Sequence, residues 1–166
     1  MNQKIYIIGP VGSGKTTFAT ALSKKYNIPY FELDKVSWDD EHGNIKRSEE
    51  EALKIFRNIL KNDSWIMEDV GRDKFKQGRV EADVIYYLKL SRFKSYYRVT
   101  KRWIRQRLGM ERYNHPPVFS QWIYFLSTVN SYYKKEKEKL KSLEEYSNKL
   151  IFINNKDMRN IIYEEE

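Results

Sequence analysis

The segment Gly9-Pro-Val-Gly-Ser-Gly-Lys-Thr16 constrains this chain most, because it matches the pattern G-x-x-x-x-G-K-[ST] at every fixed position. Its glycines let backbone N–H groups converge on a polyphosphate that side chains would keep away. An apolar run, residues 5–8, precedes the segment, and apolar residues at helical spacing follow it from Phe18. A helix that begins here points the positive end of its dipole at the same anion. The sequence therefore predicts a site for a nucleoside triphosphate.

Each residue of this phosphate loop has an expected part in the site. Lys15 reaches the β- and γ-phosphates as a positive charge, and the Thr16 hydroxyl ligates Mg²⁺. The rest of the loop and the residue after it complete the predicted nucleotide contacts: Gly9, Pro10, Val11, Gly12, Ser13, Gly14 and Thr17. ATP and Mg²⁺ are the cofactors that the sequence predicts.

Composition sets the outer limits. The chain has 166 residues, of which 40% are hydrophobic, which predicts one domain over residues 1–166 with a substantial core. It contains no cysteine, so disulfides and cysteine metal sites are excluded. The phosphate loop leaves no room for a signal peptide before it, and the apolar run Trp122–Leu126 is too short to span a bilayer. We expect a cytoplasmic protein with no membrane partner. His42 and His115 are isolated and have no metal-ligand spacing.

The net charge of +8 indicates an anionic partner. The excess is concentrated between Lys89 and Arg112, where nine Lys or Arg accompany a single acid, Glu111. In a phosphotransferase such a stretch surrounds substrate phosphates more often than a nucleic acid duplex. DNA is therefore a possible partner, but no helix-turn-helix, zinc finger or RNA-binding motif supports it.

Strand and helix patterns alternate along the chain. Short apolar runs without polar alternation predict buried strands over Lys4–Ile8, Pro29–Leu33, Trp65–Glu68, Asp83–Leu88 and Lys149–Ile153. Helices are expected over Lys15–Lys25, Ser48–Lys61, Arg92–Leu108 and Val118–Tyr146, with a short one from Lys156. This order predicts an α/β protein with the P-loop NTPase fold: a parallel five-stranded sheet with helices on both faces.

Acidic residues follow two of the predicted strands. Ligands of open α/β sheets lie at the carboxyl ends of strands, where Glu32 and Asp34 end the second strand. In an extended chain the two point to the same side, so one is expected to hold Mg²⁺-bound water and the other to orient or deprotonate an acceptor hydroxyl. We assign Glu32 to the metal and Asp34 to the acceptor. Glu68, with Asp69 as second choice, is the expected Mg²⁺-supporting acid after the third strand. The alternative for each is a cap or a solvated acid.

Three arginines form a basic helical stripe. Arg98, Arg102 and Arg105 recur at i, i+4 and i+7, while Tyr96 and Trp103 occupy another face. Guanidinium groups match phosphate oxygens, and the stripe leads into a segment rich in Gly and Pro. We therefore predict a helical lid over approximately residues 92–117 that closes over the transferring group, with the aromatics packing inside it. The alternative is a solvated basic face.

Together these segments make the chain resemble the adenylate-kinase-like P-loop phosphotransferases, and among them the small bacterial DNA topology modulation proteins. Four segments carry the resemblance: the phosphate loop, Ile28-Pro-Tyr-Phe-Glu-Leu-Asp34 with Trp38, Trp65-Ile-Met-Glu-Asp69, and the basic lid.

The resemblance implies further contacts. Glu68-Asp-Val-Gly-Arg72 stands in place of the D-G-F-P-R of nucleotide kinases, which implies that Arg72 contacts an acceptor phosphate. Arg98-Val-Thr-Lys-Arg102 matches their R-x-x-x-R, which implies that Arg98 lies near the adenine and Arg102 on the transferring phosphates. Asn154 and Lys156 would border the adenine, and Trp38 the acceptor.

The chain also departs from these relatives. Asp69 replaces a glycine, and the threonine–arginine pair expected for AMP is missing, so that Arg47 is the obvious basic candidate for the acceptor. We therefore expect a kinase that moves the γ-phosphoryl group of ATP to a nucleotide, a nucleoside or a small hydroxylated acceptor. The alternative is an ATP-binding regulator associated with DNA topology that has little or no kinase activity.

Overall fold

A computed structural model of the chain describes residues 3–39, 45–111 and 118–163. Its main sheet has five strands in the order β2-β5-β1-β6-β7, and all neighbouring strands are parallel. In chain order they are β1 (Lys4–Ile8), β2 (Tyr30–Glu32), β5 (Trp65–Asp69), β6 (Val84–Leu88) and β7 (Leu150–Ile153). The predicted P-loop NTPase fold with its five-stranded parallel sheet is confirmed.

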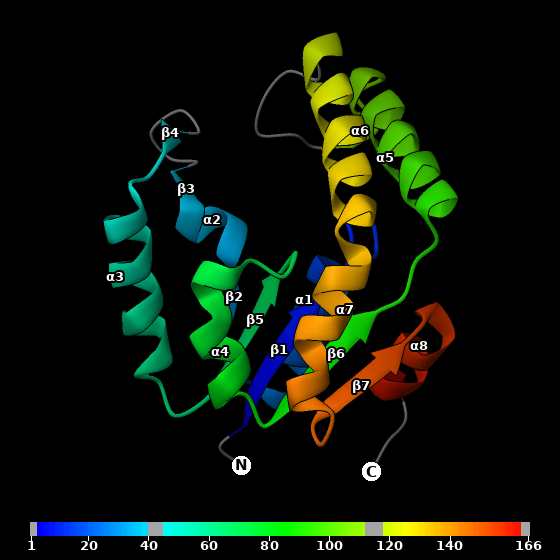
Figure 1. Ribbon diagram of the computed structural model, residues 1–166. Coiled ribbons are helices and arrows are strands. Elements are labelled where there is room, and N and C mark those ends of the chain that lie inside the picture. The colour runs from blue at the N-terminus through cyan, green and yellow to red at the C-terminus, as the bar shows by residue number, and fades with distance from the viewer. Residues whose placement is uncertain (1–2, 40–44, 112–117, 164–166) are drawn as a thin grey trace.

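Helices cover both faces of this sheet (Figure 1). Ile5 and Ile7 of β1 point to one face and Tyr6 and Ile8 to the other, because successive side chains of a strand alternate. The first face packs against α1 (Lys15–Tyr26) and α8 (Asn155–Tyr163). The second packs against α2 (Leu33–Ser37), α3 (Glu49–Leu60), α4 (Lys76–Glu81) and α7 (Glu136–Leu143).

The first of two long helices lies within the predicted lid, residues 92–117, and the second follows it. Helices α5 (Arg92–Arg107) and α6 (Phe119–Lys134) lie side by side and rise beyond the carboxyl ends of the strands (Figure 1). Trp103 of α5 stacks on Trp122 of α6, with ring centroids 5.4 Å apart. Trp103 therefore packs as predicted, whereas Tyr97 is 59% exposed. Helix α5 ends where Gly109 adopts a φ of +69°, and residues 112–117 of the predicted loop lie outside the described residues.

The prediction of one helix over Val118–Tyr146 is wrong. Helix α6 ends at Lys134, Lys135 has φ −99° and ψ 4°, and α7 follows, with a 3₁₀ turn η2 (Glu144–Tyr146) after it. The break lets α6 pair with α5, while Leu143 of α7 is buried in the core on the second face of the sheet. No glycine or proline marks this break, so local sequence signals did not reveal it.

Several short elements were also not predicted. Helix α2 begins directly after β2, and a two-stranded antiparallel ribbon joins β3 (Trp38–Asp39) to β4 (Ile45–Lys46). A 3₁₀ turn η1 (Asp73–Phe75) and α4 follow β5. These elements hold or flank the residues predicted to contact the acceptor, which are Asp34, Trp38, Arg47 and Arg72.

Candidate nucleotide and acceptor site

The phosphate loop connects β1 to α1, as predicted. Gly12 has a φ of +78°, and Gly14, the N-cap of α1, has a φ of +97°. Side chains strain such left-handed conformations, so glycine is needed where the backbone turns its N–H groups toward an anion. The loop geometry therefore explains both glycines by conformation.

Polar groups of the loop gather at its centre. Lys15 is 8% exposed, and its ammonium donates to the Pro10 carbonyl at 3.1 Å. The Ser13 hydroxyl is buried and has no hydrogen-bond partner within the described residues. Thr16 and Thr17 are exposed at the start of α1. A buried cation and a buried unpartnered hydroxyl beside a helix N-terminus are the groups that a polyphosphate would satisfy.

Helix α5 holds the outer side of the loop. The Ser95 hydroxyl donates to the Val11 carbonyl, and Arg98 Nη1 donates to the Gly12 carbonyl at 2.9 Å and to the Ser13 carbonyl at 3.4 Å. Helix α5 thus takes up the carbonyls of Val11, Gly12 and Ser13, while the Ser13 N–H donates to the Pro10 carbonyl at 3.1 Å. Ser95 was not predicted, since a lone serine in a helix carries no signal of this contact.

The residues expected at the metal meet between β5 and α1. Thr16 Oγ1 donates to Glu68 Oε1 at 2.6 Å, and Glu68 is 7% exposed. Burial raises the pKa of Glu68, although Lys15 and the Thr16 hydroxyl act in the opposite direction. Hydroxyl and carboxylate oxygens suit Mg²⁺, which keeps several ligands from water or substrate phosphates. The described residues contain no cluster of three or more His, Cys, Asp or Glu side chains, so phosphates would have to complete this site.

Glu32 and Asp34 do not share an extended strand. Strand β2 ends at Glu32, and Asp34 lies in the first turn of α2, so the alternation argument for this pair is wrong. Glu32 is in register with Glu68 on the neighbouring strand, and its Oε1 lies 2.9 Å from Lys35 Nζ. Asp34 has a side chain that is 66% exposed and forms an ion pair with Arg72.

Arg72 joins two carboxylates. Its Nη2 contacts Asp34 Oδ1, and its Nη1 lies 2.9 Å from Asp69 Oδ1. Burial by itself lowers the pKa of Arg72, but the charges of Asp69 and Asp34 outweigh it and raise that pKa. The structure therefore places Glu68 at Thr16 and leaves Asp69 bound to Arg72.

Arg47 serves the β3–β4 ribbon. Its Nη1 donates to the carbonyls of Lys35 at 2.6 Å and Trp38 at 2.8 Å, and its Nη2 lies 3.1 Å from Asp39 Oδ2. The structure therefore engages this guanidinium inside the protein, where the sequence predicted a contact to the acceptor. Trp38 is half-buried at the start of the ribbon.

The predicted arginine stripe divides. Arg98 lies against the phosphate loop, whereas Arg102 Nε and Arg105 Nε lie 3.8 and 3.6 Å from the Glu111 carboxylate. The Arg102 side chain is 67% exposed and the Arg105 side chain 49% exposed. Closure of these two arginines over a nucleotide stays a prediction.

The segment after β7 begins α8 beside the phosphate loop. Asn154 Oδ1 accepts from the backbone N–H groups of Lys156 at 2.7 Å and Asp157 at 3.3 Å, so Asn154 caps α8. A Cβ atom on Gly14 would lie 3.5 Å from Met158 of the same helix. The Asn154 side chain is occupied by its cap, and the adenine border at Asn154 and Lys156 stays a prediction.

Two further predictions concern the membrane and the histidines. No helix in the described part of the chain is long and apolar enough to cross a membrane. His42 and His115, expected to be surface or loop residues, both lie outside the described residues.

Comparisons with known proteins agree with this geometry. A family model described as the ATPase family associated with various cellular activities (AAA) matches residues 5–70, which include the phosphate loop and Glu68. A shikimate kinase from Buchnera aphidicola subsp. Schizaphis graminum (strain Sg) is 29% identical over 91 residues, which cover 46% of this chain and 50% of that relative. The chain thus matches about half the length of that relative.

Solved structures extend the likeness to the whole fold. A gluconokinase from Sinorhizobium meliloti 1021 has a TM-score of 0.55 at 15% identity, over 97% of this chain and 87% of that one. Shikimate kinase from Acinetobacter baumannii, in complex with shikimate, has a TM-score of 0.54 at 13% identity, over 96% and 88%. At this identity the likeness concerns the fold. The chain has the fold of P-loop NTPases, and these similar proteins are kinases. The resemblance to DNA topology modulation proteins is not confirmed.

Proposed function

We propose that this protein is an ATP- and Mg²⁺-dependent kinase that phosphorylates a hydroxyl group of a small molecule. The observation that carries the proposal is the arrangement at one edge of the sheet. The phosphate loop with Lys15 follows β1, Glu68 ends the neighbouring β5, and the exposed Asp34 carboxylate follows β2 beyond it. The names shikimate kinase and gluconokinase, borne by similar proteins, are names of small-molecule kinases.

The proposed reaction is an in-line transfer. The acceptor hydroxyl oxygen forms a bond to the γ-phosphorus, and the bond from that phosphorus to the β–γ bridging oxygen breaks, so that ADP leaves. The hydroxyl proton passes to the Asp34 carboxylate. Lys15 and the loop N–H groups offset the negative charge of the phosphates, and bound Mg²⁺ would neutralise further charge. Thr16 and Glu68 would hold that ion, with Glu32 beside them.

Other residues have supporting parts in this proposal. Arg98 stiffens the loop through its carbonyls, and Arg102 and Arg105 would leave Glu111 when α5 and α6 close over the nucleotide. The segment with Asn154 and Lys156 would border the adenine. Nucleosides and other hydroxylated molecules are acceptors of this reaction class, whereas a nucleotide acceptor of the adenylate-kinase type would present a phosphate oxygen and would need no proton transfer to Asp34.

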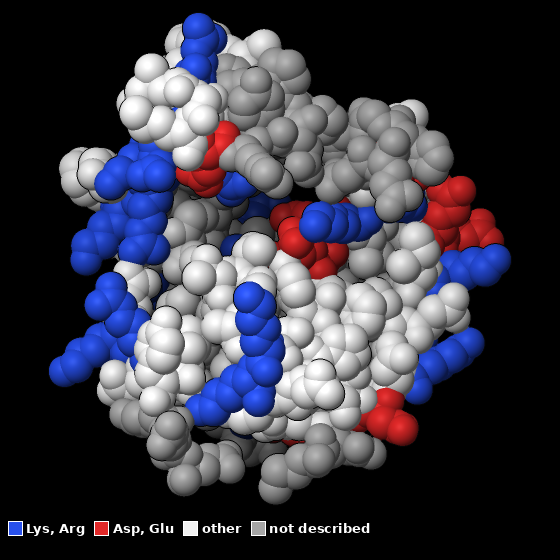
Figure 2. Space-filling view, turned by 180° about the vertical axis from the view of Figure 1, so that it is seen from behind, with Lys and Arg blue, Asp and Glu red and all other residues white. Residues whose placement is uncertain are grey.

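One observation favours a second function, that of an ATP-binding regulator associated with DNA. Helix α5 carries seven Lys or Arg residues and no acid, and basic side chains gather on the side of the molecule where α5 lies (Figure 2). Phosphate contacts of a true DNA site would make the affinity fall steeply with salt, by about 0.9 in logarithmic slope per contact. The salt dependence of duplex binding therefore measures how many phosphate contacts the protein makes.

The experiment that tests the kinase is ADP release from ATP and Mg²⁺ over a panel of nucleotides, nucleosides, sugars and polyols, with and without DNA. Acceptor-dependent turnover that Lys15→Ala abolishes supports the proposal. Binding of ATP without turnover on any acceptor, combined with salt-sensitive duplex binding, would replace it with the regulator.

A further inference from the structure

We infer that the acceptor carries no anionic group at this site and is an uncharged hydroxyl compound, such as a neutral sugar, polyol or nucleoside. The inference rests on the proposed function and concerns its acceptor half. Two arginines, Arg47 and Arg72, were predicted to bind an acidic acceptor there, and the structure commits both to partners within the protein.

Arg72 is bound to a carboxylate that it cannot leave at low cost. The Asp69 side chain is fully buried, at 0% exposure, and accepts from both the backbone N–H and the guanidinium of Arg72. Removal of one partner of a buried ion pair leaves an uncompensated charge away from water, which is strongly destabilising. The remaining edge of the guanidinium faces Asp34. An anionic acceptor that bound Nη1 and Nη2 together would compete with both carboxylates for these two nitrogens.

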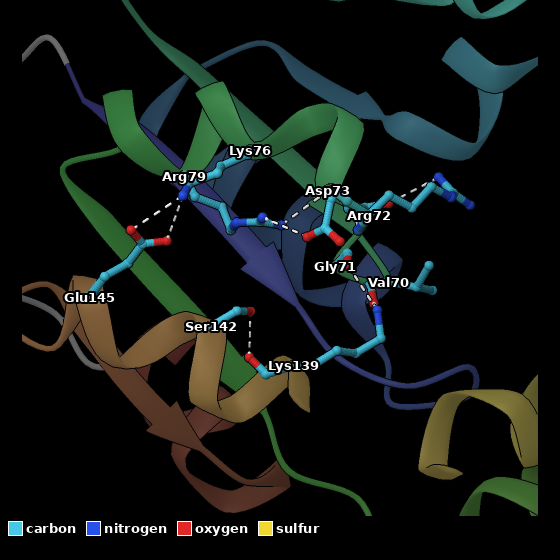
Figure 3. A network of polar contacts seen from close by, with 10 residues as sticks. Val70, Gly71, Arg72, Asp73, Lys76, Arg79, Lys139, Ser142 and Glu145 are labelled. Atoms are coloured by element: carbon cyan, nitrogen blue, oxygen red, sulfur yellow. Dashed lines mark hydrogen bonds and ion pairs between the residues drawn. The ribbon is translucent and has the colours of Figure 1, made fainter. Parts of the chain in front are cut away.

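The backbone of Arg72 is fixed as well (Figure 3). Lys139 of α7 donates to the carbonyls of Val70 at 3.0 Å and Gly71 at 2.7 Å. The buried Arg79 of α4 donates to the Arg72 carbonyl at 3.2 Å. These two cations come from different helices and hold the turn from both sides. The turn therefore cannot swing to aim Arg72 at a new anion without loss of these bonds.

The Asp34 carboxylate is the exposed acid of the acceptor half, and the exposed Lys35 ammonium beside it is paired with Glu32. The Asp34 side chain is 66% exposed, and Glu32, which precedes it by two residues, is in register with Glu68 on the neighbouring strand, so the three carboxylates lie at one edge of the sheet. A hydroxyl donates readily to such a carboxylate, whereas a second anion is repelled by it. Lys74 also lies near Arg72, with its ammonium 4.8 Å from the Phe75 ring centroid. Burial and the charge of Arg72 lower the pKa of Lys74.

A double-mutant cycle with sulfate tests this without knowledge of the acceptor. Sulfate binding is measured by calorimetry with the phosphate loop saturated by ADP and Mg²⁺. In the wild type we expect Arg72→Met to leave sulfate affinity unchanged within about twofold. Asp34→Asn frees one edge of Arg72 and should raise the affinity at least about tenfold, and adding Arg72→Met should remove the gain. Asp73→Asn is the matched control: its side chain is 93% exposed and pairs with Arg79, so it should gain nothing.

Sulfate binding that Arg72→Met or Lys74→Met weakens in the wild type would overturn the inference. A second arm compares turnover of matched acceptors: gluconate with sorbitol, shikimate with its methyl ester, and AMP with adenosine. The neutral member should have the higher kcat/KM, and a preference for the anionic member would also overturn the inference. If no acceptor is turned over but the sulfate cycle gives the expected result, the proposed kinase function is wrong and the inference about the charge of the acceptor half stands.

Discussion

The Thr16 hydroxyl donates a 2.6 Å hydrogen bond to the Glu68 carboxylate and thereby joins the start of α1 to the end of β5. The two residues are 52 positions apart in the chain. They meet because β5 lies beside β1 and parallel to it, so that both strands deliver their carboxyl ends to the same edge. The contact brings together the two kinds of oxygen that Mg²⁺ would use, and it stands one residue from Lys15.

Lys15 should be required for ATP binding but not for folding. ATP with Mg²⁺ at a hundred times Kd stabilises the folded state by about 2.7 kcal/mol, and Lys15→Ala should abolish most of the resulting rise in Tm. Without ATP the variant should melt close to the wild type. Lys24→Ala, at an exposed position of the same helix, should keep the full ATP shift. If Lys15→Ala kept the full rise in Tm with ATP, the assignment of the phosphate loop as the ATP site would be wrong.

Glu68 should make stability depend on pH. Its pKa is raised in the folded state by burial, so the protonated form contributes stability that is fully present below its ordinary pKa of 4.5. That contribution is lost as the pH rises through the folded pKa. The difference in unfolding free energy between wild type and Glu68→Gln should therefore shift against the wild type above pH 4.5. Thermal or urea unfolding of both proteins between pH 4 and 7 measures it, and a constant difference would contradict the prediction.

The nucleotide half of the site could be predicted from the sequence because each of its signals is local. The phosphate loop has a fixed spacing that one backbone geometry requires, and Glu68 follows a continuous apolar strand. The five strands are short buried runs between helical patterns, which fixes the fold class. Ser48 illustrates a local helix signal: it accepts from the Glu51 N–H at 3.2 Å, as an N-cap preceding acidic residues should.

The acceptor half could not be predicted because its contacts are between distant segments. Lys139 reads as one charge among several on a solvated helix, yet its ammonium binds the carbonyls of Val70 and Gly71. Arg47 has the positive charge expected of an acceptor contact, but its guanidinium donates to the carbonyls of Lys35 in α2 and Trp38 in β3. The break at Lys135 separates α7, which carries Lys139, from α6, and no residue type marks it. Tertiary packing, not propensity, selects these partners.

Gly78 should resist substitution because of packing. A Cβ atom there would lie 2.6 Å from Cε2 of Tyr6 and 3.3 Å from Cζ of Phe56, and both rings are buried. Glycine to alanine in a helix normally gains up to about 1 kcal/mol, but overpacking of a rigid core costs about 1–3 kcal/mol. Gly78→Ala should therefore lower the unfolding free energy in urea. Gln77→Ala, at the exposed neighbouring position, should stay within about 0.5 kcal/mol of the wild type; a stabilised Gly78→Ala would show that Tyr6 gives way.

Asp34 should act on the acceptor and not on ATP. Asn keeps the shape of the side chain but loses the negative charge that accepts the hydroxyl proton. Asp34→Asn should lower kcat/KM for the acceptor roughly a hundredfold and leave the ATP Kd within a few-fold. Glu50→Gln, an exposed change at the start of α3, serves as the control for charge at a distance. Loss of ATP binding with an intact acceptor step would assign Asp34 to the other half of the site.

Arg102 should contribute to phosphoryl transfer once α5 and α6 close. In the present structure its guanidinium faces Glu111, and closure must exchange that exposed ion pair, which is weak in water, for phosphate oxygens. We expect Arg102→Ala to lower kcat roughly 10²–10³-fold with a smaller effect on ATP affinity. A bisubstrate analogue should slow amide hydrogen exchange in α5 and α6. Arg107→Ala is the matched control, because its guanidinium lies over the Trp103 ring at 5.5 Å and off the stripe. A DNA-binding surface predicts the opposite pattern: both variants would weaken duplex binding, each reducing the salt slope by about one, while phosphoryl transfer stayed unchanged.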